Sequence, residues 1–84
     1  MGINTTYKVR ENFIETITID SLPYIFRFTF NNSEEVYQVS VVNLVHIIPF
    51  TMAQVEECAW KIIGNVPSNI KAVESLLSKM IVSG

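Results

Sequence analysis

The side chains of this sequence that are suited to covalent chemistry are one cysteine, Cys58, and one histidine, His46. A nucleophilic thiol needs a base within hydrogen-bond reach, so these two residues are the Cys/His pair that the chain could assemble. Helical spacing around Cys58 predicts that its thiol lies in an apolar stripe, where cysteine behaves as a small hydrophobic residue. His46 lies between Val45 and Ile47, a setting typical of a core or edge residue. We therefore expect no catalytic residue and a protein that is not an enzyme.

Metal and cofactor sites are not expected either. A structural zinc site takes about four ligands, usually cysteine and histidine, and the sequence has one of each. Calcium-loop and phosphate-loop signatures do not occur in it. Glu11 and Glu15 share a predicted strand face, but they lie about 13 Å apart at about 3.3 Å per residue. This separation exceeds that of the carboxyl pairs in glycoside hydrolases.

Length and composition indicate one small domain, residues 1–84, built around one core. Hydrophobic residues make up 49% of the chain and the mean hydropathy is +0.31, more apolar surface than a core of this size hides. A partner surface or a homo-oligomer, such as a homodimer, is therefore expected. The net charge is −2 without a long run of either sign, so no electrostatic footprint for nucleic acid stands out.

The single cysteine cannot close an intramolecular disulfide, which favours a reducing compartment. Residues 1–6 lack a basic stretch followed by an apolar one, and no segment approaches about 18 uninterrupted apolar residues. We expect a cytoplasmic protein that is neither exported nor inserted in a membrane.

Polar and apolar residues alternate with period 2 in the first half of the chain, which predicts strands. Turn residues at 20–23 and 31–34 separate these strands and predict registers in which Phe26 lies between Ile17 and Val39. Arg27 then lies on the opposite, polar face. The predicted strands are residues 7–19, 24–30 and 35–41, with a possible short strand at 44–48.

The second half of the chain predicts two helices. Thr51 followed by Gln54 resembles a capping box, and Gly64 provides a stop, so a helix is expected over residues 52–63. Ser68 is expected to cap a second helix over residues 69–82. The predicted fold is therefore α+β, an antiparallel β-meander of three to four strands followed by an αα-hairpin packed on one sheet face.

The helix pair raises one alternative, a DNA-binding transcriptional regulator. Gly64 before a capped helix is typical of the turn in a helix-turn-helix. The predicted second helix exposes Lys71 and Lys79 as its cations, with Glu74 between them, which provides few phosphate contacts. Nucleic acid is therefore the less favoured partner. A structural subunit of an assembly is the second alternative.

Trp60 is the strongest candidate for contact with a partner. At 100° per residue it lies outside the apolar stripe of the predicted first helix, and exposed tryptophans are common at the centre of interfaces. Glu56, Glu57 and Lys61 would form the rim of this surface. If Trp60 packs in the core instead, the outer sheet face around Arg27 is the predicted surface. We therefore expect a non-catalytic binding protein, an inhibitor or regulator that occupies a protein partner's surface, like the small accessory proteins of mobile elements or viruses.

Overall fold

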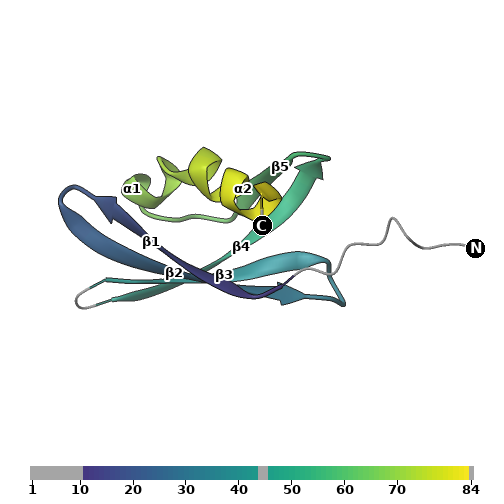
Figure 1. Cartoon of the computed structure of the whole chain (residues 1–84), viewed down its shortest axis with the longest axis horizontal. Helices are drawn as coiled ribbons and strands as arrows, with labels where there is room; N and C mark the ends of the chain where they lie inside the picture. Colours follow the sequence, from purple (N-terminus) through teal and green to yellow (C-terminus); the bar gives the residue numbers. More distant parts are fainter. Residues whose placement is uncertain (1–10, 44–45, 84) are drawn as a thin grey trace, which may run out of the picture.

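The chain forms one antiparallel sheet with two short helices on one side of it (Figure 1). The computed structural model describes residues 11–43 and 46–83. The elements are β1 (Phe13–Ile19), β2 (Leu22–Asn31), β3 (Val36–Val42), β4 (Ile47–Glu56), β5 (Ala59–Ile63), α1 (Ser68–Lys71) and α2 (Glu74–Ser83). The strands pair in sequence order, β1-β2-β3-β4-β5. The α+β class and the antiparallel meander are therefore confirmed, with five strands where three to four were predicted.

The first hairpin is tighter than predicted. Asp20 and Ser21 have positive φ angles of 52° and 68°, as a two-residue type I′ turn requires. Ile19 therefore lies opposite Leu22, and Ile17 lies opposite Tyr24 rather than Phe26. A shift of two residues leaves every side chain on its predicted face, because the side-chain period of a strand is also two.

The second hairpin shows the same even shift. The Asn31 carbonyl accepts a hydrogen bond from the Glu35 amide at 2.7 Å, and Glu35 has a positive φ of 58°. Phe26 lies opposite Val41 rather than Val39. Phe26 and Val41 are both buried, so the predicted apolar face is correct although the predicted partners are not.

The helix predicted over residues 52–63 is wrong. This segment forms the end of β4, a turn and the strand β5. Met52 and Ile62 fit a helical stripe, but they also belong to the period-2 pairs Phe50/Met52 and Trp60/Ile62, and all four side chains are buried. Pairing with β3 on one side and β5 on the other selects the strand pattern. The residues that the helical stripe needed inside but that are exposed are Val55, Cys58 and Ile63.

The remaining predicted boundaries are adjusted. The helix predicted over 69–82 divides into α1 and α2, and Pro67 rather than Ser68 occupies the N-cap without a side-chain cap. The predicted strand at 44–48 corresponds at its end to the start of β4, while residues 44–45 lie outside the described residues. Residues 7–10 of the first predicted strand also lie outside them.

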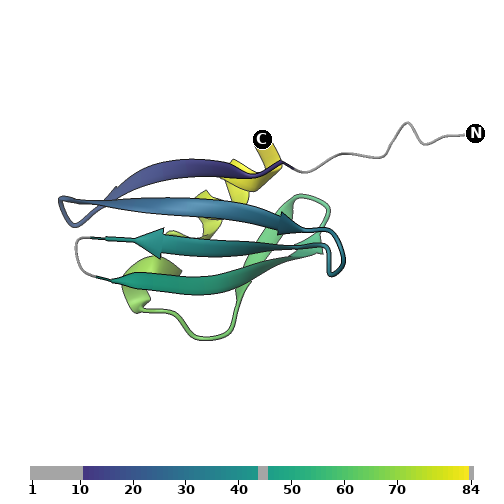
Figure 2. The ribbon, with the colours of Figure 1, turned by 90° about the horizontal axis from the view of Figure 1, so that it is seen from below.

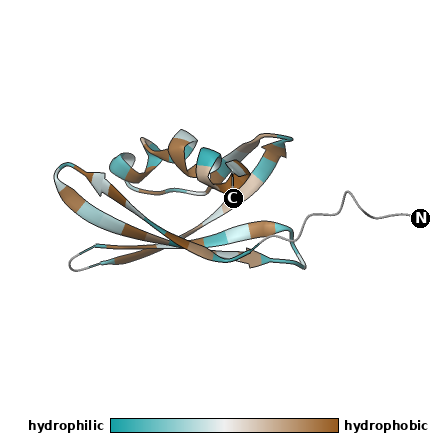
Figure 3. Cartoon of the chain, viewed as in Figure 1, coloured by the Kyte–Doolittle hydropathy of each residue, from teal (hydrophilic) through white to brown (hydrophobic). Residues whose placement is uncertain are grey.

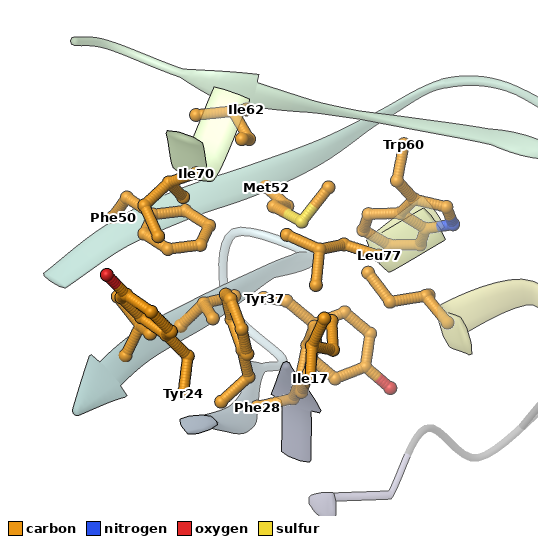
Figure 4. Packing of buried hydrophobic residues seen from close by; sticks show 14 of the residues in the cluster. Ile17, Tyr24, Phe28, Tyr37, Phe50, Met52, Trp60, Ile62, Ile70 and Leu77 are labelled. Carbon is orange, nitrogen blue, oxygen red and sulfur yellow. The ribbon is translucent and has the colours of Figure 1, made fainter. Parts of the chain in front are cut away.

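The core lies between the sheet and the helices (Figure 4). Hydropathy alternates along the strands, as their colours show (Figure 3). Phe26 and Phe28 have no exposed surface, and the helices contribute the buried side chains of Ile70, Leu77 and Ile81. An aromatic cluster extends across the sheet: the rings of Phe13 and Phe28 stack at 4.3 Å, and Phe30 and Trp60 meet Tyr37 edge-on at 5.1 and 5.4 Å.

Within residues 11–43 and 46–83, no helix has the length and apolar character needed to cross a membrane.

The two sides of β2 differ in the cost of truncation. Phe26→Ala removes a fully buried ring and should lower the free energy of unfolding by about 3 to 5 kcal/mol. Arg27→Ala changes an exposed residue and should cost at most about 0.5 kcal/mol. Denaturant melts of the two variants measure this difference. Equal losses of stability would contradict the assignment of the sheet faces.

Candidate functional site

Trp60 does not lie on an exposed helical face. Its side chain is 2% exposed and packs edge-on against Tyr37 in the core (Figure 4). The expected presentation of Trp60 to a partner is therefore wrong in its geometry, because β5 turns residues 60 and 62 inward. The alternation of Trp60 and Ile62 after the polar run Glu56-Glu57 was the signal for this arrangement.

The expected rim residues do not surround a common centre. Glu56 and Glu57 lie exposed where β4 turns into β5, and Lys61 is exposed on β5. Arg27 is exposed on β2, three strands from β5, which corresponds to about 14 Å at about 4.8 Å per strand. The structure thus separates Arg27 from the other predicted contact residues. The remaining candidate from the sequence is the outer sheet face around Arg27.

The outer face of the sheet is the side that the helices leave uncovered (Figures 1 and 2). Arg27 lies near its middle, with Ile14 and Ser40 as its cross-strand neighbours. The outer face is formed by residues of β1 to β4 whose side chains point away from the core. Its central residues are Ile14, Thr16, Ile25, Arg27, Thr29, Gln38, Ser40, Val42, Ile47, Pro49 and Thr51.

An apolar row crosses the outer face beside Arg27. Ile25, Val42 and Ile47 are direct neighbours on three adjacent strands and are 43%, 36% and 71% exposed. On the other side of Arg27 the face is polar, and the Thr51 hydroxyl donates a hydrogen bond to Oε1 of Gln38 at 3.3 Å. The outer face therefore offers apolar contact and hydrogen-bonding groups side by side.

Arg27 is the one charged residue among the central residues of the outer face, and within the described residues its guanidinium forms no ion pair. It borders a shallow hollow of about 500 Å³ at the start of β1. The hollow is lined by Asn12, Phe13, Ile14, Arg27, Phe28 and Thr29. A free guanidinium beside apolar and hydroxyl groups is suited to a carboxylate or carbonyl acceptor on a partner.

Cys58 and His46 are far apart. Cys58 lies exposed in the turn after β4, so the expectation of a buried thiol is wrong, and His46 lies exposed just before β4. The ten residues of β4 separate them by about 30 Å at about 3.3 Å per residue. The fold therefore does not assemble the Cys/His pair. Among the described residues, no three histidine, cysteine, aspartate or glutamate side chains cluster so that they could hold a metal ion.

A charged cluster joins α2 to the edge of β5. The carboxylate of Glu74 accepts a hydrogen bond from the Ile62 amide at 2.7 Å and one from Nζ of Lys71 at 3.2 Å, and Lys61 lies 3.9 Å away. The backbone hydrogen bond from Ile62 is the main cause of a lowered pKa at Glu74. Lys71 and Lys61 also lower that pKa, and desolvation opposes them. The charge of Glu74 is therefore used within the protein, where it attaches α2 to β5.

The helix-turn-helix alternative loses its first helix. The segment before Gly64 is the strand β5, and α1 after it has four residues. A recognition helix docked against a preceding helix of the same motif is therefore not formed by these residues.

Comparisons with family models, with curated proteins and with solved structures gave no match. Function is therefore inferred from the geometry of the chain itself.

The Glu74 carboxylate should stabilise the protein in a pH-dependent way. Glu74→Ala leaves the Ile62 amide without its acceptor and should lower the free energy of unfolding by about 1 to 3 kcal/mol at neutral pH. Because the folded-state pKa lies below the ordinary value of 4.5, this stabilisation is present above that value and is lost as the pH falls through the folded-state pKa. Chemical denaturation between acidic and neutral pH measures it.

Glu74→Gln and Glu34→Gln form the matched pair for this measurement, since Glu34 lies exposed in a turn. The stability difference between wild type and Glu74→Gln should shrink on acidification, whereas Glu34→Gln should follow wild type. A difference for Glu74→Gln that does not change with pH would contradict the role of the charge.

Trp60 provides an optical test of the core. Its burial predicts a blue emission that iodide quenches poorly in the dilute folded protein, with a red shift on unfolding. Emission spectra and quenching, with N-acetyltryptophanamide as the exposed reference, measure both properties. A red, readily quenched emission from the folded chain would show that β5 does not turn Trp60 inward.

Proposed function

We propose that this chain is a non-catalytic binding protein, an inhibitor or regulator, that occupies the surface of a protein partner with the outer face of its sheet around Arg27. The observation that carries the proposal is the uncovered outer face itself. Both helices lie on the other side of the sheet, while Ile25, Val42 and Ile47 present an apolar row beside Arg27.

The composition of the outer face supports a protein partner. Interface centres are rich in apolar side chains and arginine and poor in acidic residues. The central outer face agrees with this in its isoleucines, its one arginine and its lack of acidic residues, and the side chains around them are valine, proline, threonine, serine and glutamine. Hydroxyl and amide groups at its polar end can form hydrogen bonds with the backbone of a partner, and these bonds do not require a charged group on the partner.

The charge distribution supports a partner that offers acidic or carbonyl groups. The chain has eight acidic residues and a net charge of −2, yet the central outer face carries the cation Arg27. The acidic residues that lie elsewhere in the fold are Glu11, Glu15, Asp20, Glu34, Glu35, Glu56, Glu57 and Glu74. A partner approaching this face meets Arg27 and no central acidic side chain, which favours complementary pairing at Arg27.

The separation of Cys58 and His46 by the length of β4 favours binding over covalent chemistry. An enzyme using these two groups would have to bring them within hydrogen-bond reach. Binding through the outer face requires no such movement.

Substitutions on the two sides of the protein test this function. Proteins retained from an extract by the immobilised wild-type chain are compared with those retained by Arg27→Glu, Ile47→Glu and the control Lys79→Glu on α2. A partner bound through the outer face should be kept by Lys79→Glu. It should lose at least about thirtyfold in affinity for Arg27→Glu, the equivalent of about 2 kcal/mol.

Direct titration of the recovered partner gives the affinities. A partner that binds Arg27→Glu and Ile47→Glu as tightly as wild type would overturn the assignment of the outer face. Turnover of a substrate that is lost on substitution of Cys58 or His46 would overturn the non-catalytic role.

A further inference from the structure

The two edges of the sheet differ in how their backbone groups are satisfied. At β5, the amide of Trp60 donates to Oγ of Ser78 at 2.9 Å, and the amide of Ile62 donates to Oε2 of Glu74 at 2.7 Å. Both acceptors belong to α2. β5 is also short, with five residues. The side chains of α2 therefore occupy the backbone donors that a further strand would need at this edge.

Among residues 11–43 and 46–83, no element covers the β1 edge in this way. β1 is seven residues long, and within the described part of the chain no side chain hydrogen-bonds to its backbone. It contains no proline, lysine or bulge, three of the devices that prevent strand addition, and its one charged residue is Glu15. As far as the described residues go, the sheet thus has one closed edge and one edge that can accept a further strand.

We propose that β1 pairs with β1 of a second copy of this chain, antiparallel, with Thr16 on the two-fold axis. The two sheets then join into one continuous sheet. This register is the one that pairs all seven residues of β1 with all seven of the second copy. It places Phe13 opposite Ile19, Ile14 opposite Thr18, and Glu15 opposite Ile17.

The side chains of β1 are self-complementary in this register. Ile14 and Thr18 extend the outer face across the junction, and the Thr16 pair on the axis is a favourable cross-strand pair. On the core side, Phe13 meets Ile19 at each end of the junction, and the exposed Glu15 lies opposite Ile17 between these two apolar pairs.

Charge selects this register among the alternatives. Glu15 is the one charged residue of β1, and centring the pair on Thr16 places it opposite Ile17 instead of another carboxylate. Centring on Glu15 would set two carboxylates face to face, which is unfavourable. Centring on Ile17 would move Phe13 beyond the end of the other strand, opposite Ser21 in the turn.

The inference concerns an edge of the sheet and does not depend on the function proposed for the outer face. Pairing along β1 leaves Arg27 and the apolar row uncovered on both copies. A seven-residue edge is a small interface, so the association is weak and depends on concentration.

Charge reversal on the axis tests the pairing. Thr16 is exposed, so Thr16→Lys and Thr16→Glu should leave the fold intact, which circular dichroism and thermal melts check. Sedimentation equilibrium over a concentration series should show self-association of wild type and at least tenfold weaker association of each variant alone. An equimolar mixture of the two variants should associate again, because lysine then faces glutamate across the axis.

Thr29→Lys is the matched control, since it makes the same change on the same face of the neighbouring strand. It should associate like wild type. A cross-link confirms the register: Thr16→Cys in a Cys58→Ser background should be joined by a short bis-maleimide, and Thr29→Cys should not.

Three results would overturn the proposal. The first is a wild-type chain that stays monomeric throughout the series. The second is association that Thr16→Lys leaves unchanged. The third is association that Thr29→Lys abolishes while Thr16→Lys does not, which would place the contact between outer faces. A monomeric wild type whose different protein partner is lost through Thr16→Lys but kept by Thr29→Lys would assign the edge to that partner instead.

Discussion

The hydrogen bonds between β5 and α2 hold the two layers of this protein in place. Ser78 and Glu74 accept from the amides of Trp60 and Ile62 at 2.9 and 2.7 Å. Four residues of helix rise about 6 Å, and two residues of strand span about 6.6 Å, so the spacings match when α2 runs beside β5. The same two strand residues turn their side chains into the core. Each is therefore fixed through its side chain and its main chain together.

This attachment determines which surfaces remain free. With α2 on the core side and bonded to the β5 edge, the helices leave the outer face uncovered, and their side-chain acceptors serve the β5 edge rather than the β1 edge (Figures 1 and 2). The charges follow the same division. Glu74 is satisfied by a backbone amide and two lysines inside the attachment, whereas Arg27 lies on the free face among neutral neighbours. The element that stabilises the fold and the surface available to a partner are thus on opposite sides.

The free outer face and the free edge are perpendicular to each other. Strand addition uses backbone groups in the plane of the sheet, and contact through the outer face uses side chains above that plane. Ile14 and Thr16 belong to both surfaces. A strand added at the edge would therefore extend the outer face, and a partner on the outer face would lie next to the edge. A sheet doubled along β1 would present two Arg27 side chains on one continuous face.

Sequence alone determined β1 to β3, their faces and the place of Arg27. Alternation has a period of two, and an error of two residues in each turn moved Phe26 from Val39 to Val41 without moving any side chain to the other face.

Tertiary structure decided the segment from Met52 to Ile63. There, apolar residues fit the helical spacing as well as the strand spacing, and the alternation of Trp60 and Ile62 was too short a signal to choose between them. Backbone pairing of β4 with β3 and the acceptors that α2 supplies to β5 favoured the strands. That choice put Trp60 inside and Cys58 outside, because a strand turns alternate residues inward where a helix would have buried a stripe.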